Sequence, residues 1–574
     1  MRSPRLGLLV MVLIGGMAMQ VRGQAVREHS HTAVSAQGMV ATVNPYATDA
    51  GVRALEAGGN ALDAAIASAL MLGVVDGYNS GLGGGCLIVM RCADGTLLAI
   101  DGRETAPAAA TRDMYLRDGK AVPALSRDGA LAVAVPGALA AYEWGLREQG
   151  RLPLSQLATW AAERAEEGFR VNSAYAAAIA KMTPILDEFP GLAAKLRKPD
   201  GQCYTEGDVL PQPDLAKSLR AIAKGGTDWF YRGPYATEVA KWMAAHGGEI
   251  TTADFEAYRA KQRDPVISTY RDFTIVGFPP PSSGGVHVAQ ILNILERFDL
   301  AALHQQDPAV AVHVISEAMK LAFADRAYWL GDADFARVPR GLVDQDYADV
   351  LAKRIQLDRV IEVPQHGMPA DWETNVFGKH TTHLATVDRE GNWVAMTATI
   401  NTTFGSKVVV PGTGIVLNNE MDDFSAQPGV PNVFGLVGAE NNAIEPGKRP
   451  LSCMSPTLVL KDGEPVMSIG AAGGPRIISQ ALLGIVRHLD FGMDLSDAIA
   501  EPRFHHQWAP GYLRVEESYP EEKREALRAL GHEVRAFRSG GVSQGITRLP
   551  DGTYLGVHDP RIPGKCAGPQ PTTK

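Results

Sequence analysis

The clearest alternation of apolar and polar residues lies in the stretch 379–405. Period-2 alternation runs over 381–387 and again over 393–399, and the residues between them, DREGN, are typical of a turn. The stretch is therefore predicted to form a β-hairpin. Threonines crowd both strands, which fits the strand propensity of this residue without any further role.

Apolar patterns elsewhere predict that strands and helices succeed one another along the chain. Short apolar runs predict strands at 38–43, 86–91, 96–101, 412–419 and 465–469, with another strand after Asp272. Longer periodic segments predict helices at 47–57, 60–75, 136–149, 286–298, 309–328 and 481–489. The span 153–263 is predicted to be a largely helical outer layer in which 225–231 forms turns, and the stretch before Phe377 a long surface loop with short helices.

The first residues have the layout of a secretory signal peptide. Arg2 and Arg5 precede an apolar run over 6–19, and small residues follow. The run is shorter than the ~20 residues that a membrane-spanning helix needs, although a lone N-terminal anchor is the alternative. We expect cleavage near Gly23 or Ala25, so that 1–23 is removed and a bacterial protein without a stable membrane anchor reaches the periplasm or the medium.

Composition places the chain among ordinary soluble globular proteins. It has 574 residues, 45% hydrophobic and 21% charged, and a net charge of −9, which argues against a nucleic-acid partner. We find no zinc-type spacing, phosphate-binding loop or repeat. Of the five cysteines, Cys86 and Cys92 lie in one predicted strand, ~20 Å apart, whereas a disulfide spans at most ~7 Å between Cα atoms. The fold is therefore not expected to depend on disulfides.

A threonine at the start of the hairpin could carry chemistry. A threonine hydroxyl is a weak nucleophile unless a base lies beside it, and the α-amine of an N-terminal threonine can be that base. An internal threonine gains such an amine only when the preceding peptide bond is cut. The strand start K-H-T-T-H resembles that of the γ-glutamyltranspeptidase family of N-terminal-nucleophile hydrolases. The resemblance implies autocleavage of the His380–Thr381 bond and Thr381 as the nucleophile.

Two further motifs carry the resemblance at the substrate's α-carboxylate. D-x-R-E-x-A-P contains Arg103, and P-L-S-C-M-S-P contains Ser452 and Cys453. The family motifs imply that Arg103 and the two side chains at 452 and 453 bind this carboxylate, and a guanidinium suits the task because it pairs both oxygens. Cys453 departs from the serine of the family and is only a weak donor. By itself, Arg103 could equally be a surface arginine.

A second group of motifs implies the ammonium subsite and the catalytic donors. N-E-M-D-D-F supplies Glu420 and Asp423, and N-T-T-F-G supplies Asn401, all implied to bind the substrate's α-ammonium. Acids at a strand end could instead form a solvated turn. The pair Gly473 and Gly474 is implied to form the oxyanion hole, and Thr399 to hydrogen-bond the hydroxyl or amine of Thr381.

Other motif residues are expected to be structural or to line the pocket. Phe434 stands in a segment that resembles the family's lid loop, where many bacterial members have tyrosine. Ser282 and Ser283 have no nucleophile elbow around them and are expected to cap the following helix. His505 and His506 could be metal ligands, but neighbours in a strand point opposite ways, so a structural role is expected.

The resemblance covers nearly the whole mature chain and implies the four-layer αββα sandwich of N-terminal-nucleophile hydrolases. It implies a large subunit, 24–380, and a small subunit, 381–574, that form one intertwined unit. The implied activity is hydrolysis or transfer of the γ-glutamyl group of glutathione and related compounds, to water or to amino acid or peptide amines, without metal or organic cofactor. The alternatives are a glutaryl-type (cephalosporin) acylase on the same scaffold and an inactive periplasmic binding homologue.

Overall fold

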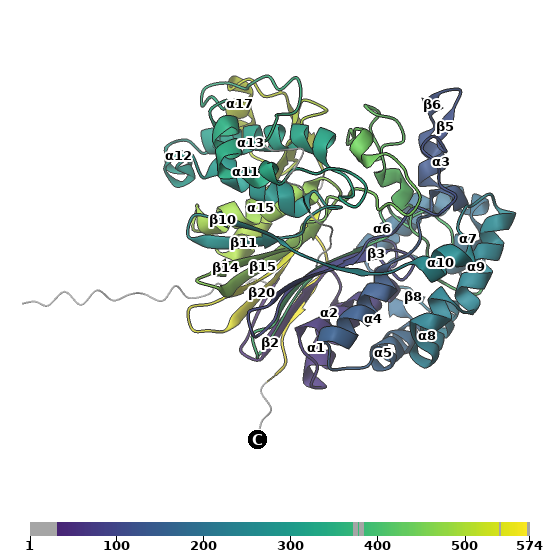
Figure 1. Ribbon diagram of the computed structural model, residues 1–574. Helices are drawn as coiled ribbons and strands as arrows, with labels where there is room; N and C mark the ends of the chain where they lie inside the picture. Colours follow the sequence, from purple (N-terminus) through teal and green to yellow (C-terminus); the bar gives the residue numbers. More distant parts are fainter. Residues whose placement is uncertain (1–30, 371–376, 378–383, 539–540, 571–574) are drawn as a thin grey trace, which may run out of the picture.

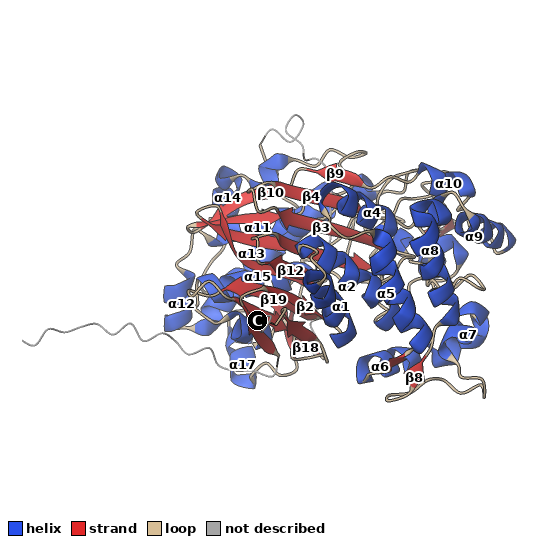
Figure 2. Cartoon of the chain, turned by 90° about the horizontal axis from the view of Figure 1, so that it is seen from below, coloured by secondary structure: helices blue, strands red, loops and turns tan. Residues whose placement is uncertain are grey.

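The computed structural model describes residues 31–370, 377, 384–538 and 541–570, and it is built from two seven-stranded sheets packed face to face (Figure 1). Helices cover the outer face of each sheet, so the molecule has four layers in the order α, β, β, α. Figure 2 shows the strands crossing the middle of the molecule with helices on both sides. The predicted αββα sandwich is confirmed.

Sheet 1 has the strand order β1-β20-β19-β15-β14-β11-β10, and all its neighbours are antiparallel. Its strands are β1 (Thr32–Ser35), β10 (Val266–Tyr270), β11 (Phe273–Gly277), β14 (Thr457–Lys461), β15 (Glu464–Ala472), β19 (Val542–Arg548) and β20 (Tyr554–His558).

Sheet 2 has the order β21-β2-β12-β13-β3-β4-β9 and is also antiparallel throughout. Its strands are β2 (Gly38–Thr42), β3 (Gly85–Arg91), β4 (Leu97–Gly102), β9 (Lys261–Arg263), β12 (Ala385–Asp388), β13 (Trp393–Thr399) and β21 (Lys565–Ala567). Each sheet combines strands from before 371 with strands from after 383, so the two parts of the chain share one core.

The layer on sheet 1 buries its apolar residues against β11, β14 and β15. Its helices are α11 (Gly284–Leu295), α12 (Leu300–Gln306), α13 (Pro308–Trp329), α14 (Gln345–Ala352), α15 (Arg476–Leu489), α16 (Leu495–Ala500) and α17 (Glu521–Ala529). A small three-stranded sheet packs beside them: β16 (Phe504–His505), β17 (Leu513–Glu516) and β18 (Val534–Phe537).

The layer on sheet 2 is centred on α1 (Pro45–Glu56) and α2 (Ala61–Val75). α2 is apolar all round and buried along nearly its whole length, as its composition predicts. The remaining helices of this side are α3 (Pro123–Arg127), α4 (Ala138–Gln149), α5 (Leu154–Glu167), α6 (Ser173–Met182), α7 (Pro190–Leu196), α8 (Pro213–Tyr231), α9 (Pro234–Ala245) and α10 (Thr252–Ala257). No described helix is both long and apolar enough to span a bilayer.

Two predicted elements are wrong. The segment 412–419 forms isolated bridges rather than a strand, because Gly412 (φ 77°) and Gly414 (φ 64°) turn the backbone out of an extended conformation. The supposed turns of 225–231 belong largely to α8, which continues past a single break at Gly226 (φ 63°). The other predicted elements agree in type and differ mainly at their ends. All five cysteines are free, as expected.

Candidate active site

A pocket of about 420 Å³ opens where β13 of sheet 2 and β15 of sheet 1 end beside each other. It brings together nine of the residues that the sequence motifs single out, although they come from segments up to 371 residues apart (103 to 474). These residues are Arg103, Thr399, Asn401, Glu420, Asp423, Ser452, Cys453, Gly473 and Gly474. The lid residue Phe434 lines the same pocket.

The backbone at both strand ends positions these groups. Beyond β13, Asn401 adopts a positive φ of 74°, and its backbone N–H donates to the Thr399 hydroxyl at 2.7 Å. Beyond β15, Gly473 (φ 139°) and Gly474 (φ 62°) take conformations that disfavour other residues. A Cβ on Gly474 would lie 2.7 Å from the ring of Phe434, so the lid packs directly on this glycine.

Arg103 is the centre of a buried ion cluster at one end of the pocket. Its Nη1 donates to Glu420 and its Nη2 to Asp423, each at 2.6 Å, and its Nε donates to the carbonyl of Pro450 at 3.1 Å. Glu104 adds a third carboxylate 3.6 Å from Nη1. The sequence motifs assign Arg103 and the acids to opposite ends of a ligand, whereas in the structure they pair with one another.

This cluster contains more negative than positive charge. Three carboxylates face one guanidinium, and both oxygens of Glu104 and one of Glu420 have no hydrogen-bond partner among the described residues. Burial raises the pKa of Glu104 to about 8 and also raises the pKa values of Glu420 and Asp423, although Arg103 opposes the shift. The cluster therefore favours a further positive charge, supplied by protons or by a ligand.

Ser452 and Cys453 lie beside this cluster and are held by groups from sheet 1 and its helices. The hydroxyl of Ser452 accepts from the N–H of Met454 at 3.2 Å. The Cys453 sulfur accepts from Arg326 Nη2 at 3.1 Å, and Arg326 Nε donates to Ser283 Oγ at 2.9 Å. The thiol is thus fixed by α13, and burial raises its pKa.

The expected capping role of Ser283 is wrong. Ser283 occupies the N-cap position of α11, but its side chain makes no capping hydrogen bond. Its hydroxyl instead donates to the carbonyl of Ser452 at 2.7 Å, because Arg326 and Ser452 provide better-placed partners. Ser282 does accept from the N–H of Gly284 at 3.0 Å, as a cap would.

Comparison with known proteins identifies the scaffold. The sequence matches the family described as Gamma-glutamyltranspeptidase over residues 47–568. This chain belongs to that family. It is 43% identical over 536 residues to the glutathione hydrolase proenzyme of Escherichia coli (strain K12), covering 92% of this chain and 91% of the relative. It is 40% identical to the acylase ACY 1 proenzyme of Pseudomonas sp. (strain V22), with 92% of both chains covered.

Among solved structures, the chain resembles a cephalosporin acylase from Bacillus halodurans. The TM-score is 0.84 at 28% identity, and the match covers 96% of this chain and 99% of the other. The family resemblance inferred from the motifs is therefore confirmed. The pocket at the strand ends is the candidate active site of this family member.

The proposed cleavage bond and nucleophile, His380 and Thr381, lie outside the described residues. The hairpin that follows them is described from Leu384 onward. Ala385 pairs with Ala395 in β13, and the N–H of Met396 donates to the carbonyl of Leu384. The pairing register of β12 and β13 is thus defined from Leu384 onward.

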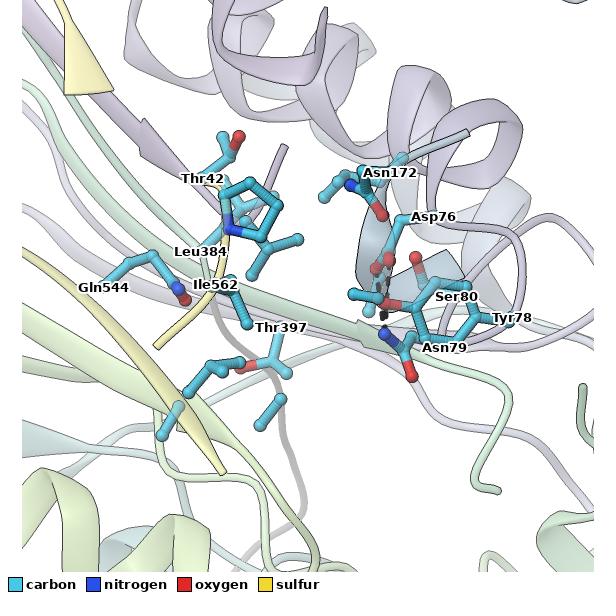
Figure 3. Close-up of a pocket in the computed structure, with 18 residues that line it drawn as sticks. Thr42, Asp76, Tyr78, Asn79, Ser80, Asn172, Leu384, Thr397, Gln544 and Ile562 are labelled. Carbon is cyan, nitrogen blue, oxygen red and sulfur yellow. Dashed lines mark hydrogen bonds between the residues drawn. The ribbon is translucent and has the colours of Figure 1, made fainter. Parts of the chain in front are cut away.

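A smaller cavity of about 140 Å³ adjoins the pocket (Figure 3). The two share Asn79, Thr397, Ala398 and Ala472 as lining residues. In the smaller cavity, the carboxylate of Asp76 accepts from the Asn79 amide at 3.2 Å, and burial raises the pKa of Asp76 to about 7.

Four residues of the site region were not assigned a role from the sequence. Glu104 lies inside the same motif as Arg103, and Arg476 follows the two glycines, so both stand next to recognised positions. Lys181 and Arg326 lie on helices without any local motif. Lys181 and Arg476 line the pocket, whereas Arg326 acts through Cys453.

The expected structural role of the two adjacent histidines agrees with their contacts. His505 contacts Ser479 Oγ and Gln507, and His506 accepts from the N–H of Trp508. A separate cluster with metal-ligand chemistry joins His313, Glu317 and His532 within 4.8 Å among the described residues.

In this cluster His313 and His532 already hydrogen-bond each other at 2.7 Å. The ammonium of Lys320 lies 2.7 Å from Glu317. Because a second cation beside that ammonium would be repelled, the contacts favour a structural network over a metal site.

Proposed function

We propose that this protein is a γ-glutamyl hydrolase and transferase. It cleaves the γ-glutamyl amide of glutathione and related compounds, and passes the acyl group to water or to the amine of an amino acid or peptide. The observation that carries the proposal is the surplus of buried carboxylates around Arg103.

An α-amino acid end group matches that surplus. Its ammonium supplies the positive charge that Glu420, Asp423 and the neighbouring Glu104 lack, and Asn401 borders the same region of the pocket. Its carboxylate pairs with the guanidinium of Arg103 and with the side chains at 452 and 453. A charge-assisted pair in a buried site is strong because water does not screen it.

Thr381 is the proposed nucleophile, with its own α-amine as the base. Counting four residues back from Ala385 and four forward from its partner Ala395 gives 381 and 399. We propose that this pairing continues in the processed enzyme, which would set Thr381 opposite Thr399, whose hydroxyl already accepts one hydrogen bond and keeps its proton for another.

The reaction then follows acyl-transfer chemistry. The Thr381 hydroxyl attacks the γ-carbonyl as its proton moves to the α-amine, and the N–H groups at Gly473 and Gly474 stabilise the oxyanion. The amine group leaves with the proton, and water or an acceptor amine resolves the ester. These steps use groups of the chain and the substrate together with the water or acceptor amine.

Maturation uses the same hydroxyl. Thr381 attacks the carbonyl of His380, and hydrolysis of the ester leaves a large subunit, 24–380, and a small subunit, 381–574. Because both sheets contain paired strands from both parts, the products stay together as a heterodimer. Removal of 1–23 as a signal peptide would deliver the enzyme to the periplasm or the medium.

The decisive experiment is Thr381→Ala. The variant is expected to remain one uncut chain without activity on a γ-glutamyl anilide, whereas wild type yields a fragment whose N-terminus is Thr381. Thr381→Ser, which keeps a hydroxyl, is the matched control and should still be cut. Two subunits in the alanine variant would contradict the assignment, and an uncut wild type would favour the inactive binding homologue.

A glutaryl-type acylase remains the alternative on this scaffold, because a relative at 40% identity is named acylase ACY 1 proenzyme and a similar solved structure is a cephalosporin acylase. A glutaryl group has no α-ammonium, so it would leave the carboxylate surplus uncompensated. Wild type is expected to cleave the γ-glutamyl anilide much faster than the glutaryl anilide. The reverse preference would establish the acylase.

A further inference from the structure

Two cations of the pocket lie apart from the Arg103 cluster. Arg476 is the first residue of α15, directly after the glycines and Pro475, and Lys181 lies near the end of α6. The two helices belong to opposite outer layers, so the cations reach the pocket from both of its sides.

Within the described chain, neither cation has an ion-pair partner within 4 Å. The pocket's two lining carboxylates, Glu420 and Asp423, are already paired with Arg103. Nε of Arg476 is buried without a hydrogen-bond partner. Glu516, the acid that most influences Arg476, is bound by Arg561 at 2.7 Å. Burial and the nearby Arg514 lower the pKa of Arg476, and its guanidinium lies 5.7 Å over the ring of Phe537 rather than against an acid of the described chain.

The position of Arg476 relative to the reaction centre defines what it can contact. The Arg103 cluster receives the amino acid end of the substrate, and the glycine pair receives the carbonyl oxygen that reacts. Arg476 follows those glycines, so it borders the space beyond the scissile amide. The first turn of α15 adds the positive end of its helix dipole to the same region.

We propose that Arg476 and Lys181 form a subsite for a carboxylate on the leaving amine. This inference rests on the proposed function and names its preferred substrate class: γ-glutamyl amides whose amine portion carries an anionic group, such as a peptide with a free C-terminus. Arg476 makes the main charge-assisted pair, and the exposed Lys181 adds a weaker attraction at the mouth. The site thus recognises both the amino acid end and the leaving-amine end of its substrate through charged groups.

The test compares two substrates that differ in one carboxylate, γ-glutamyl-4-nitroanilide and γ-glutamyl-3-carboxy-4-nitroanilide, on fully processed enzyme. Wild type is expected to have the higher kcat/KM for the carboxylated anilide. Arg476→Gln lowers that preference about tenfold, the value of a lost charge-assisted hydrogen bond. Lys181→Gln lowers it about two- to fivefold, as an exposed ion pair would.

Lys224→Gln is the matched control, because it removes one exposed cation on α8, outside the pocket. It should leave the ratio between the two substrates unchanged. Glutathione and its C-terminal amide provide a second pair with a natural leaving group. Subunit formation in every variant verifies that it has folded.

The outcomes separate this inference from the proposed function. If wild type cleaves neither anilide, the proposed function itself fails. If both anilides are cleaved and Arg476→Gln and Lys181→Gln each keep the wild-type ratio, the carboxylate subsite is wrong while the activity stands. If Lys224→Gln loses as much of the preference for the carboxylated anilide as Arg476→Gln does, the preference arises from the net charge of the protein. That result would also overturn the subsite.

Discussion

Two buried ion clusters meet at the end of β4, and they differ in charge balance. Asp101 and Glu104 are three residues apart, and both are fully buried. Asp101 accepts a hydrogen bond from Arg263 at 2.7 Å and forms an ion pair with Arg449 at 3.3 Å. The cluster around Asp101 contains equal numbers of cations and acids: Lys261, Arg263 and Arg449 with Asp101, Asp332 and Asp334.

The cluster around Glu104 has no such balance. Among the residues that the structure describes, Arg103 alone forms ion pairs with Glu104, Glu420 and Asp423. The pKa values of Asp101 and Glu104 reflect this difference, although burial acts to raise both. Arg449 and Arg263 hold the pKa of Asp101 below its usual range, whereas the pKa of Glu104 rises to about 8.

The comparison shows that burial of charge does not by itself mark a binding site. The Asp101 cluster compensates its own charge and has the character of a structural tie between β4, β9 and the segment around Arg449. The Glu104 cluster borders the pocket and lacks positive charge, so a ligand can complete it. Removing one acid should therefore have opposite consequences in the two places.

The largest effect is expected from Asp101→Asn. It leaves the guanidinium groups of Arg263 and Arg449 buried without their shared carboxylate, and breaking a buried pair in this way costs about 3–5 kcal/mol. Thermal or urea unfolding of the processed enzyme measures the loss. The ratio of kcat/KM between γ-glutamyl and glutaryl anilides should stay near that of wild type in the fraction that folds. A stable variant with altered selectivity would make the Asp101 cluster part of the site.

An intermediate effect is expected from Glu104→Gln. Because the folded-state pKa of Glu104 lies above its unfolded value, the ligand-free folded enzyme binds the extra proton between pH ~4.5 and ~8. Its stability therefore falls as pH rises through that window. Glutamine imitates the protonated acid, so the Tm of the variant should decline less with pH than that of wild type.

The same substitution should weaken substrate binding. Deprotonation of Glu104 creates the charge that an ammonium neutralises, so the wild-type KM should fall as pH rises, and this trend should flatten in Glu104→Gln. The loss in kcat/KM at high pH is expected to be about tenfold, as for a charged hydrogen bond. Parallel pH profiles of Tm and KM in the two enzymes would show that Glu104 stays neutral and outside the site.

Much of the fold could be predicted from the sequence because local pattern and final structure agree. The apolar character of α2 and the alternation in β13 specify burial before any tertiary contact is known. The failures arise where backbone geometry overrides composition. Gly412 and Gly414 interrupt an apolar run that would otherwise pair as a strand, and Gly226 breaks α8 without ending it.

The sequence could predict which residues form the site, but not which of these residues bond to one another. Arg103 and Glu420 are 317 residues apart, and no local pattern indicates that they bond to each other. The role of Arg326 could not be predicted either, because its hydrogen bond to Cys453 depends on how α13 packs beside the pocket. Motifs identify the residues that belong to one site, whereas the balance of charge among these residues depends on their arrangement in the folded structure.

The smallest effect is expected at Cys453, a neutral group at the edge of the unbalanced cluster. Its sulfur accepts from Arg326, so its own proton remains available, but a thiol is a weak donor. A serine here can accept the same guanidinium bond and donate a stronger one to the substrate's α-carboxylate. Cys453→Ser should therefore raise the preference for a γ-glutamyl anilide over its α-amide analogue by up to ~1 kcal/mol in kcat/KM.

Cys203→Ser makes the same exchange outside the pocket and is the control for this measurement. A change of the substrate ratio in Cys453→Ser alone would show that position 453 contacts the carboxylate. An unchanged ratio would mean that Arg326 holds the side chain away from the substrate. Carboxylate selectivity would then depend on Arg103 and Ser452, and the surplus of acids around Arg103 would contribute to the recognition of the ammonium only.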